Sequence, residues 1–372
     1  MLRIFLILTI LLTSSCLFSK KITIKGKGNI KLQQVDFFEL NDWENDDHKK
    51  ALQAFLHSCN KFAKMPQNRL IGGQIGEITI SDFRDVCDIA EVVKTMSSKQ
   101  TKNFFENWFR PFLVETRFGN ENGVFTGYYE ASLNGNKIKT EKYKYPVYAR
   151  PKDLSSDPYL SRKEIEEGAL KHKALELLYV DDKTDLFFMH IQGSGRVKLS
   201  NGSEIRLAYA GRNNQPYTSI GNPMADLGYL KRDQINSATI REWLKNNPEK
   251  ADEAMNINAA FTFFKISESE HVVGAQGVPL TTERSLAIDS EIIPYGFPLF
   301  VETALKKKDG NKEKYNHLLI AQDTGSAIKG IVRGDIFFGY GKEAEEKAFY
   351  MASQGKYYIL LPINVMDKMI GK

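Results

Sequence analysis

Apolar residues in the first third of the chain recur at the three- and four-residue spacing of amphipathic helices. The range 51–62 has this spacing at Leu52, Phe55, Leu56, Cys59 and Phe62. A second stripe begins after Ser81 and Asp82, a typical helix start, and continues through Val86, Ile89, Val92 and Val93. We therefore predict helices in this part of the chain and expect them to pack on a core.

The pattern changes near Val124, where short runs of β-branched and aromatic residues alternate with Gly, Asn and Pro. Strands are predicted at 124–129, 145–148, 186–192, 204–209, 260–265 and 357–362. The dipeptides Asn134-Gly135 and Asn201-Gly202 are typical of hairpin turns. Helical patterns interrupt this series only at 235–244 and 248–255. The pattern predicts a mainly β protein with a helical N-terminal segment.

The first residues have the pattern of a secretory signal peptide. Arg3 precedes the apolar run 4–12, which is too short to span a bilayer. Thr13-Ser14-Ser15-Cys16 then resembles a bacterial lipoprotein cleavage box, although Thr13 stands where leucine is usual. We expect residues 1–16 to be the signal peptide, Cys16 to be lipidated, and residues 17–44 to be a tether. An ordinary signal peptide and a soluble periplasmic protein are the alternative.

Composition narrows the function classes. The 372 residues are enough for two domains, and a net charge of +5 is too small to indicate nucleic-acid binding. Besides Cys16 the chain holds only Cys59 and Cys87, which could pair in an oxidising compartment or remain two free thiols. Because no Cys/His cluster is present, we expect no metal site and no cofactor.

One stretch, Gln322 to Gly341, holds two carboxylates, Asp323 and Asp335, among five glycines. Glycines allow sharp turns and close approach of a ligand to the backbone. The two acids could face a groove, or they could bond only to nearby backbone N–H groups in a hairpin. The residues alone do not decide between these interpretations.

Other polar and aromatic groups lie on short motifs upstream. We expect them to contact a sugar polymer, through amides, hydroxyls and rings. These candidates are Thr126 and Tyr128 on FTGYYE, Gln192, Ser194 and Arg196 on QGSGR, Tyr209 and Asn213 on YAGRNNQPY, and Lys329 beside the acids. Each motif is also compatible with a core strand or a plain surface turn.

The order of these motifs, followed by PLTTERSLAIDSEIIPYG and QDTGSAIKGIVRGDIFFGYG, resembles the membrane-bound lytic murein transglycosylase A family. The last two blocks resemble its C-terminal domain named for three aspartates, which here would be Asp289, Asp323 and Asp335. The resemblance implies a double-psi β-barrel domain and a second, inserted β-rich domain with a groove between them. On this basis we expect the first domain to span 45–130 and 258–372, and the insert 131–257.

The resemblance also implies an activity. Family members cleave the β-1,4 bond between N-acetylmuramic acid and N-acetylglucosamine of peptidoglycan and leave 1,6-anhydromuramoyl ends. Asp335 would be the single acid/base, with Asp323 and Asp289 as supporting acids. We expect a monomer on the periplasmic face of the outer membrane, with peptidoglycan strands and, through its lipid, the membrane as partners. Two alternatives are an inverting hydrolase that uses two aspartates and a non-catalytic peptidoglycan-binding lipoprotein.

Overall fold

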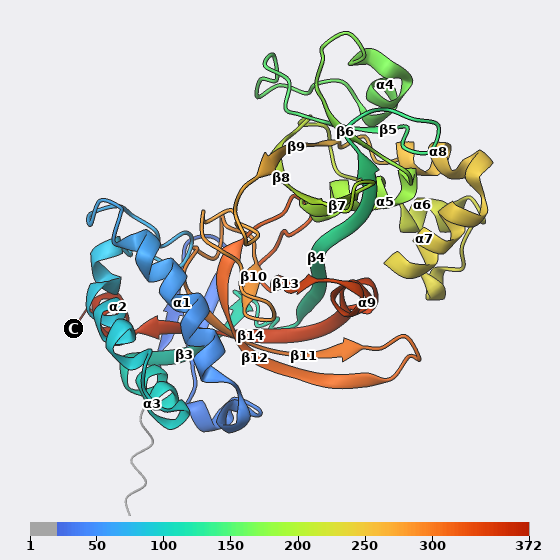
Figure 1. Cartoon of the computed structure of the whole chain (residues 1–372). Helices are drawn as coiled ribbons and strands as arrows, with labels where there is room; N and C mark the ends of the chain where they lie inside the picture. Colours follow the sequence, from blue (N-terminus) through green and yellow to red (C-terminus); the bar gives the residue numbers. More distant parts are fainter. Residues whose placement is uncertain (1–20, 372) are drawn as a thin grey trace, which may run out of the picture.

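The computed structural model describes residues 21–371, which form two parts joined by one long strand, β4 (Gly123–Asn136) (Figure 1). The lower part in Figure 1 holds the strands that precede β4 and those that follow β9, and the upper part holds the segment between β4 and β9. The first half of β4 pairs with strands of the lower part, and its second half pairs with strands of the upper part. The residues predicted to form the signal peptide, including Cys16, lie outside the described residues. No helix in the range 21–371 is long and apolar enough to cross a membrane.

The lower part is built on a mixed sheet whose strands come from both ends of the chain. Apart from β4, its strands are β1 (Thr23–Lys25), β2 (Ile30–Gln34), β3 (Phe109–Thr116), β10 (Ser285–Ala287), β11 (Pro298–Lys306), β12 (Lys312–Asp323), β13 (Arg333–Tyr340) and β14 (Ala352–Pro362). Their order is β1-β2-β3-β14-β11-β12-β10-β13-β4, and β14 also pairs with β4. The six strands β14, β11, β12, β10, β13 and β4 are therefore paired in a closed ring.

Helices cover this sheet (Figure 1). They are α1 (His48–Phe62), α2 (Arg84–Val93), α3 (Ser98–Trp108), α9 (Lys342–Tyr350) and α10 (Ile363–Met369), with short 3₁₀ turns η1 (Phe37–Glu39), η2 (Trp43–Asn45) and η3 (Ile80–Phe83). The predicted apolar face of α1 is buried in the core at every position from Leu52 to Phe62 that the spacing indicated. The helices predicted at 51–62 and after Ser81 are thus confirmed.

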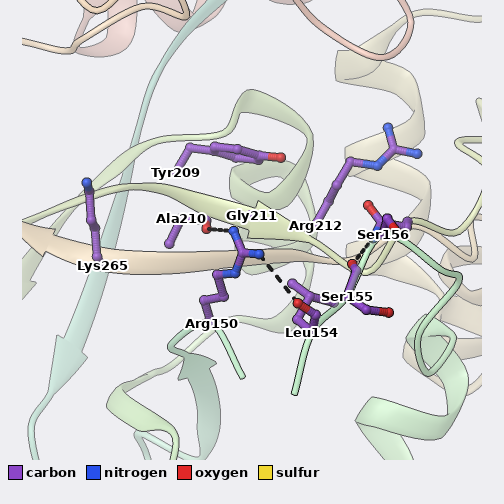
Figure 2. A pocket seen from close by; sticks show the side chains of 10 residues that line it. Arg150, Leu154, Ser155, Ser156, Tyr209, Ala210, Gly211, Arg212 and Lys265 are labelled. Carbon is purple, nitrogen blue, oxygen red and sulfur yellow. Dashed lines mark hydrogen bonds between the residues drawn. The ribbon is translucent and has the colours of Figure 1, made fainter. Parts of the chain in front are cut away.

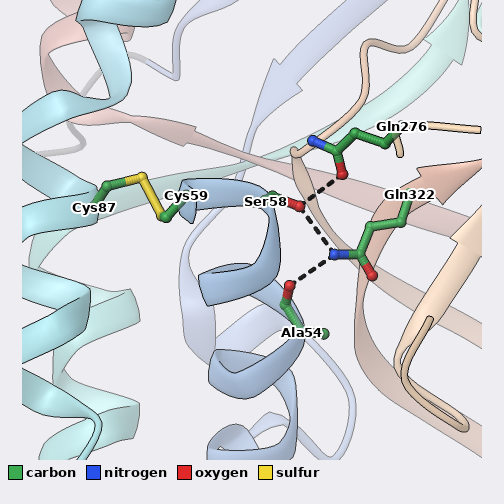
Figure 3. The surroundings of a disulfide bond; sticks show 6 residues. All are labelled: Ala54, Ser58, Cys59, Cys87, Gln276 and Gln322. Carbon is green, nitrogen blue, oxygen red and sulfur yellow. Dashed lines mark hydrogen bonds between the residues drawn. A yellow bond between two sulfur atoms is a disulfide. The ribbon is translucent and has the colours of Figure 1, made fainter. Parts of the chain in front are cut away.

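A disulfide between Cys59 and Cys87 joins α1 to α2 (Figure 3). The same turn of α1 holds the end of β12, because the buried Gln322 amide donates to Ala54 O at 2.7 Å and to Ser58 Oγ at 2.9 Å. The Ser58 hydroxyl donates in turn to Gln276 Oε1 at 2.8 Å (Figure 3). Buried polar groups need such partners, and here they fix the residue that precedes Asp323.

The expected tether 17–44 is wrong for the residues from 21 onward, which belong to the fold. β2 pairs with both β1 and β3, and Ile30 and Leu32 are completely buried. The lysines and glycines of this segment suggested a linker. They conceal a two-residue alternation of isoleucine and leucine with polar residues, which is the pattern of a half-buried strand.

The upper part, between β4 and β9, mixes helices with strands and is not simply β-rich. Its strands are β5 (Tyr145–Tyr148), β6 (Glu176–Val180), β7 (Gly195–Leu199), β8 (Glu204–Arg212) and β9 (Thr262–Ser267). Its helical segments are α4 (Arg162–Glu164), the π-helical turn η4 (Ile165–Ala169), α5 (Lys183–Gln192), α6 (Gly221–Asp226), the 3₁₀ turn η5 (Arg232–Gln234), α7 (Ser237–Asn246) and α8 (Pro248–Asn256).

Two predictions in this part are wrong. The strand predicted at 186–192 is helix α5, which Asp182 caps at its start and Gly193, with φ of 81°, ends. All residues from Leu186 to His190 are buried, so the segment has no regular spacing of apolar and polar residues from which a helix could be told from a strand. The dipeptide Asn134-Gly135 lies inside β4 instead of a turn, whereas Asn201-Gly202 does connect β7 to β8.

Candidate active site

Three strands and the first half of β4 place the two acids of the C-terminal segment on one face of the sheet. In the register, Ala287 on β10 pairs with Asp323 on one side and with Asp335 on the other, and Asp335 also pairs with Thr126. Directly paired residues point to the same face, and two strand spacings separate the Cα atoms of the acids by about 10 Å. The small side chain of Ala287 therefore lies between two carboxylates.

Asp335 is partly buried and has no ion-pair partner within 4 Å among the described residues. The Thr126 hydroxyl donates to Asp335 Oδ1 at 2.5 Å, and Arg333 Nη2 donates to Thr126 Oγ1 at 2.8 Å. Burial raises the pKa of Asp335, the charge of Asp323 adds to this effect, and Arg333 and the Thr126 hydrogen bond oppose it. The net direction is upward, which favours a protonated carboxyl group.

Asp323 has a different environment, because three donors hold it. The Tyr128 hydroxyl donates to Asp323 Oδ2 at 2.7 Å, and the N–H groups of Ala275 and Thr324 donate to Oδ1, each at 2.9 Å. Burial raises the pKa of Asp323 above its ordinary value, although these three hydrogen bonds act in the opposite direction. Asp323 is thus fixed in place, while Asp335 has acceptor capacity left for a ligand.

Asp289 lies beyond the end of β10 and is buried. Its carboxylate accepts from the Gly330 N–H at 3.0 Å and from Lys329 Nζ at 3.2 Å. Lys329 also contacts Glu291 at 3.1 Å and is half exposed. These contacts tie the loop between β12 and β13 to the end of β10, so Asp289 positions the loop that leads from Asp323 to Asp335.

The upper part contributes a tyrosine that the sequence analysis did not single out. Burial raises the pKa of Tyr217, and the next cause is the charge of Asp335, so the phenol lies near that acid. Tyr217 follows β8 on the same loop as Asn213. Its position in the motif YAGRNNQPY was the available indication, but nothing in the motif distinguishes it from Tyr209.

The other residues of the upper part that were predicted to contact a sugar differ in how far their side chains are already bound within the protein. Gln192 Oε1 accepts from the Tyr129 N–H at 3.0 Å, which places this side chain beside β4, and Ser194 is buried in the turn before β7. Arg196 is bound to Glu130 and Glu204 and lies over the Tyr340 ring. Its charge is therefore neutralised within the protein.

Neither Asn213 nor Tyr209 has a hydrogen bond to Asp323 or Asp335. Asn213 is completely buried, and its amide donates to Leu160 O and Ala259 O, both at 2.8 Å, while its oxygen accepts from the Phe261 N–H. The side chain has no capacity left for a sugar, which corrects that expectation. Tyr209 is half exposed and lines a separate cavity on the upper part (Figure 2).

Comparison with known proteins agrees with this arrangement. The family described as "MltA specific insert domain" matches residues 124–265, and the family described as "3D domain" matches residues 284–361. A solved structure of MltA from Neisseria gonorrhoeae is 35% identical, with a TM-score of 0.76 over 92% of this chain and 94% of that one. The chain belongs to the membrane-bound lytic murein transglycosylase A family.

Other members of this family are similar over different lengths. The lytic transglycosylase from Agrobacterium tumefaciens superposes with a TM-score of 0.81 at 29% identity, over 92% of this chain and all of that one. Membrane-bound lytic murein transglycosylase A of Vibrio cholerae is 35% identical over 64% of this chain, and the aligned part spans only 65% of that relative. The family's two matched regions meet at the sheet face that carries Asp323 and Asp335.

Within residues 21–371, no group of three or more His, Cys, Asp or Glu side chains is placed to hold a metal ion. The site instead offers two carboxyl groups with a raised pKa, of which Asp323 is held by hydrogen bonds and Asp335 is more open, with tyrosine hydroxyls around them. Such a set can donate a proton to a leaving oxygen and accept one back.

Proposed function

We propose that the protein is a lytic transglycosylase that cleaves the β-1,4 bond between N-acetylmuramic acid and N-acetylglucosamine in peptidoglycan and forms 1,6-anhydromuramoyl ends. The observation that carries this proposal is the contrast between the two acids. Burial raises the pKa of both acids, but Asp335 accepts from one hydroxyl while Asp323 is occupied by three donors. One carboxyl group is thus available for proton transfer.

One such group is sufficient for the lytic reaction. Protonated Asp335 gives its proton to the glycosidic oxygen as the bond from C1 of the muramoyl ring breaks. The C6 hydroxyl of the same ring then attacks C1, and its proton passes to the Asp335 carboxylate, which restores the acid. The nucleophile is already part of the substrate, so its proximity replaces an activated water.

Asp323 and Tyr128 support this role without taking part in the proton transfer themselves. The negative charge of Asp323 helps to keep Asp335 protonated, and the Tyr128 hydroxyl fixes Asp323 in the geometry that produces this effect. We also place Tyr217, Gln192 and Ser194 at the glycan, on the side that the upper part supplies. Lys329 remains a proposed glycan contact because its side chain is half exposed.

The proposal extends to architecture and location. We propose that the six strands from β14 to β4 form a double-psi β-barrel and that the chain divides near 131 and 257 into this domain and its insert. We also propose a monomer anchored to the outer membrane by a lipid on Cys16. Incorporation of labelled fatty acid into the wild type, but not into Cys16→Ala, would test the anchor.

A two-acid hydrolase is the second candidate, because Asp323 and Asp335 share a face two strand spacings apart, and inverting glycosidases also use two separated carboxyl groups. The three donors on Asp323 oppose it, since they already occupy both oxygens of the carboxylate that would have to take a proton from the attacking water. Mass analysis of the products released from purified sacculi separates the candidates. The lytic reaction gives anhydro ends, hydrolysis gives products heavier by one water, and a non-catalytic protein releases nothing.

A further inference from the structure

The upper part carries a cavity of about 830 Å³ whose charged lining is entirely basic. Arg150, Arg212 and Lys265 supply three positive charges, and neither Asp nor Glu lines the cavity. The half-exposed ring of Tyr209 and the backbone of Ala210 and Gly211 complete one wall (Figure 2). Unlike the sheet face of Asp335, this cavity has no carboxylate that could take part in proton transfer.

The three charges are uncompensated, whereas other basic residues on the sheet of the upper part are paired. Arg206 on β8 and Arg196 on β7 both bind Glu130, with N–O distances of 2.5 and 2.7 Å. Within the described residues, Arg150, Arg212 and Lys265 have no carboxylate within 4 Å and donate at most to backbone carbonyls. Unpaired guanidinium groups that line a cavity are well suited to bind carboxylates.

A single loop connects this cavity to the proposed active site. Arg212 lines the cavity at the end of β8, and its Nη2 donates to Gln215 O at 2.7 Å. Tyr217 lies five residues further along, where the charge of Asp335 acts on it. Five residues span at most about 17 Å when extended, so an anionic branch of a few residues on a bound glycan could reach from Asp335 to the cavity.

We propose that this basic cavity binds the carboxylates of the acidic peptide branch, the stem peptide, that murein carries on its muramoyl units. The inference rests on the proposed function and adds a substrate feature to it. A neutral sugar would require hydrogen-bond partners and an aromatic surface but not three uncompensated cations. The glycan would be bound at the sheet face of Asp335, and the peptide carboxylates would be bound at Arg150, Arg212 and Lys265.

The test compares two forms of the same soluble glycan strands. One form carries native stem peptides, and in the other the peptide carboxylates are converted to methylamides, which removes the charge and keeps the length. Binding is measured at low salt on the Asp335→Asn protein and repeated on the wild type at low temperature. We expect native strands to bind about tenfold more tightly than amidated strands, from one or two charged hydrogen bonds.

Lys265→Gln and Arg150→Gln should each reduce this tenfold preference severalfold. Lys265→Gln is the cleaner variant, because this strand residue is exposed and has no partner within the described residues to lose. Lys308→Gln, on the exposed turn between β11 and β12, removes an equal charge far from the cavity and should keep the full preference. Thermal denaturation of each variant shows whether the fold is intact.

Equal affinity of the wild type for native and amidated strands would overturn the proposal, as would a preference that Lys265→Gln and Arg150→Gln leave unchanged. Because these are equilibrium affinities, they do not depend on turnover. Failure of the proposed function would appear instead in the product masses. The two failures are therefore distinguishable.

Discussion

At the residue scale, neighbouring charges act on one carboxyl group, that of Asp335. Burial is the largest cause that raises the pKa of Asp335, and Asp323 acts in the same direction, while Arg333 acts against both. A general acid works only while it is protonated, so the rate should fall as the pH rises through this raised pKa. The alkaline limb of the pH–rate profile therefore reports on Asp335.

Two neutralising variants should move that limb in opposite directions. In Asp323→Asn the like charge is lost, the pKa of Asp335 falls, and the alkaline limb moves to lower pH. In Arg333→Gln an opposing positive charge is lost, the pKa rises, and the limb moves to higher pH. The profile of kcat/KM against pH measures both shifts, and Lys308→Gln is the control. Shifts in the same direction would contradict this electrostatic assignment.

The sequence singled out the candidate acids but did not show what distinguishes them. Asp323 and Asp335 stand in similar glycine-rich surroundings, and only the register shows that both pair with Ala287. The three donors to Asp323 come from Tyr128, Ala275 and Thr324, two of which are far away in the sequence. Likewise, Asn213 lies in a polar, aromatic motif and was expected to contact a sugar. It is instead completely buried, and its amide holds the loop together through hydrogen bonds to the backbone.

At the element scale, α1 connects the helical segment to the strand that carries Asp323. The disulfide from Cys59 to Cys87 closes a loop with a sequence separation of 28 residues between α1 and α2. Replacing both cysteines by serine should lower the free energy of unfolding by about 3–4 kcal/mol, since the unfolded chain gains freedom. Urea denaturation with and without a thiol reductant measures this, and only the wild type should respond to the reductant. Unchanged stability of the double variant would contradict the prediction.

A buried ion pair ties the N-terminal segment to β12. Asp46, which has no exposed side-chain surface, accepts from His317 Nδ1 at 2.8 Å and contacts Arg284 at 2.9 Å. Burial opposes ionisation of Asp46, but the hydrogen bond from His317 and the charge of Arg284 prevail and hold its pKa well below its ordinary value. Its contribution to stability is therefore present above the usual Asp range and is lost as the pH falls through the lowered pKa.

Asp46→Asn should lower the free energy of unfolding at neutral pH by about 3–5 kcal/mol, because Arg284 would remain buried without its partner. The loss should be smaller in acid, where the wild-type carboxylate is itself protonated. Denaturation curves at neutral and strongly acidic pH measure this difference. Asp47→Asn, one residue further along at the exposed N-cap of α1, is the control, because asparagine caps a helix about as well as aspartate. A loss that does not depend on pH would contradict the assigned role.

At the scale of the whole molecule, the protein is two sheet-containing parts that share β4. Helices α1 and α2 and the predicted strands that lie in β4, β5, β8, β9 and β14 followed from spacing and alternation, whereas the position of the insert was implied by the family resemblance. Three features did not follow. The strand at 30–34 is hidden by lysines, the helix at 183–192 lacks a polar face, and the cross-domain position of Tyr217 depends on tertiary contacts alone.

The central claim is that Asp335 alone transfers the proton, and turnover by Asp335→Asn on purified sacculi tests it most directly. We predict that the variant folds and still binds glycan strands. It should be no less stable than the wild type, because the substitution removes a carboxyl group whose pKa is raised by burial. Its release of anhydromuropeptides should fall by at least about 10³-fold. A folded Asp335→Asn protein that releases these products at a rate near that of the wild type would contradict the account.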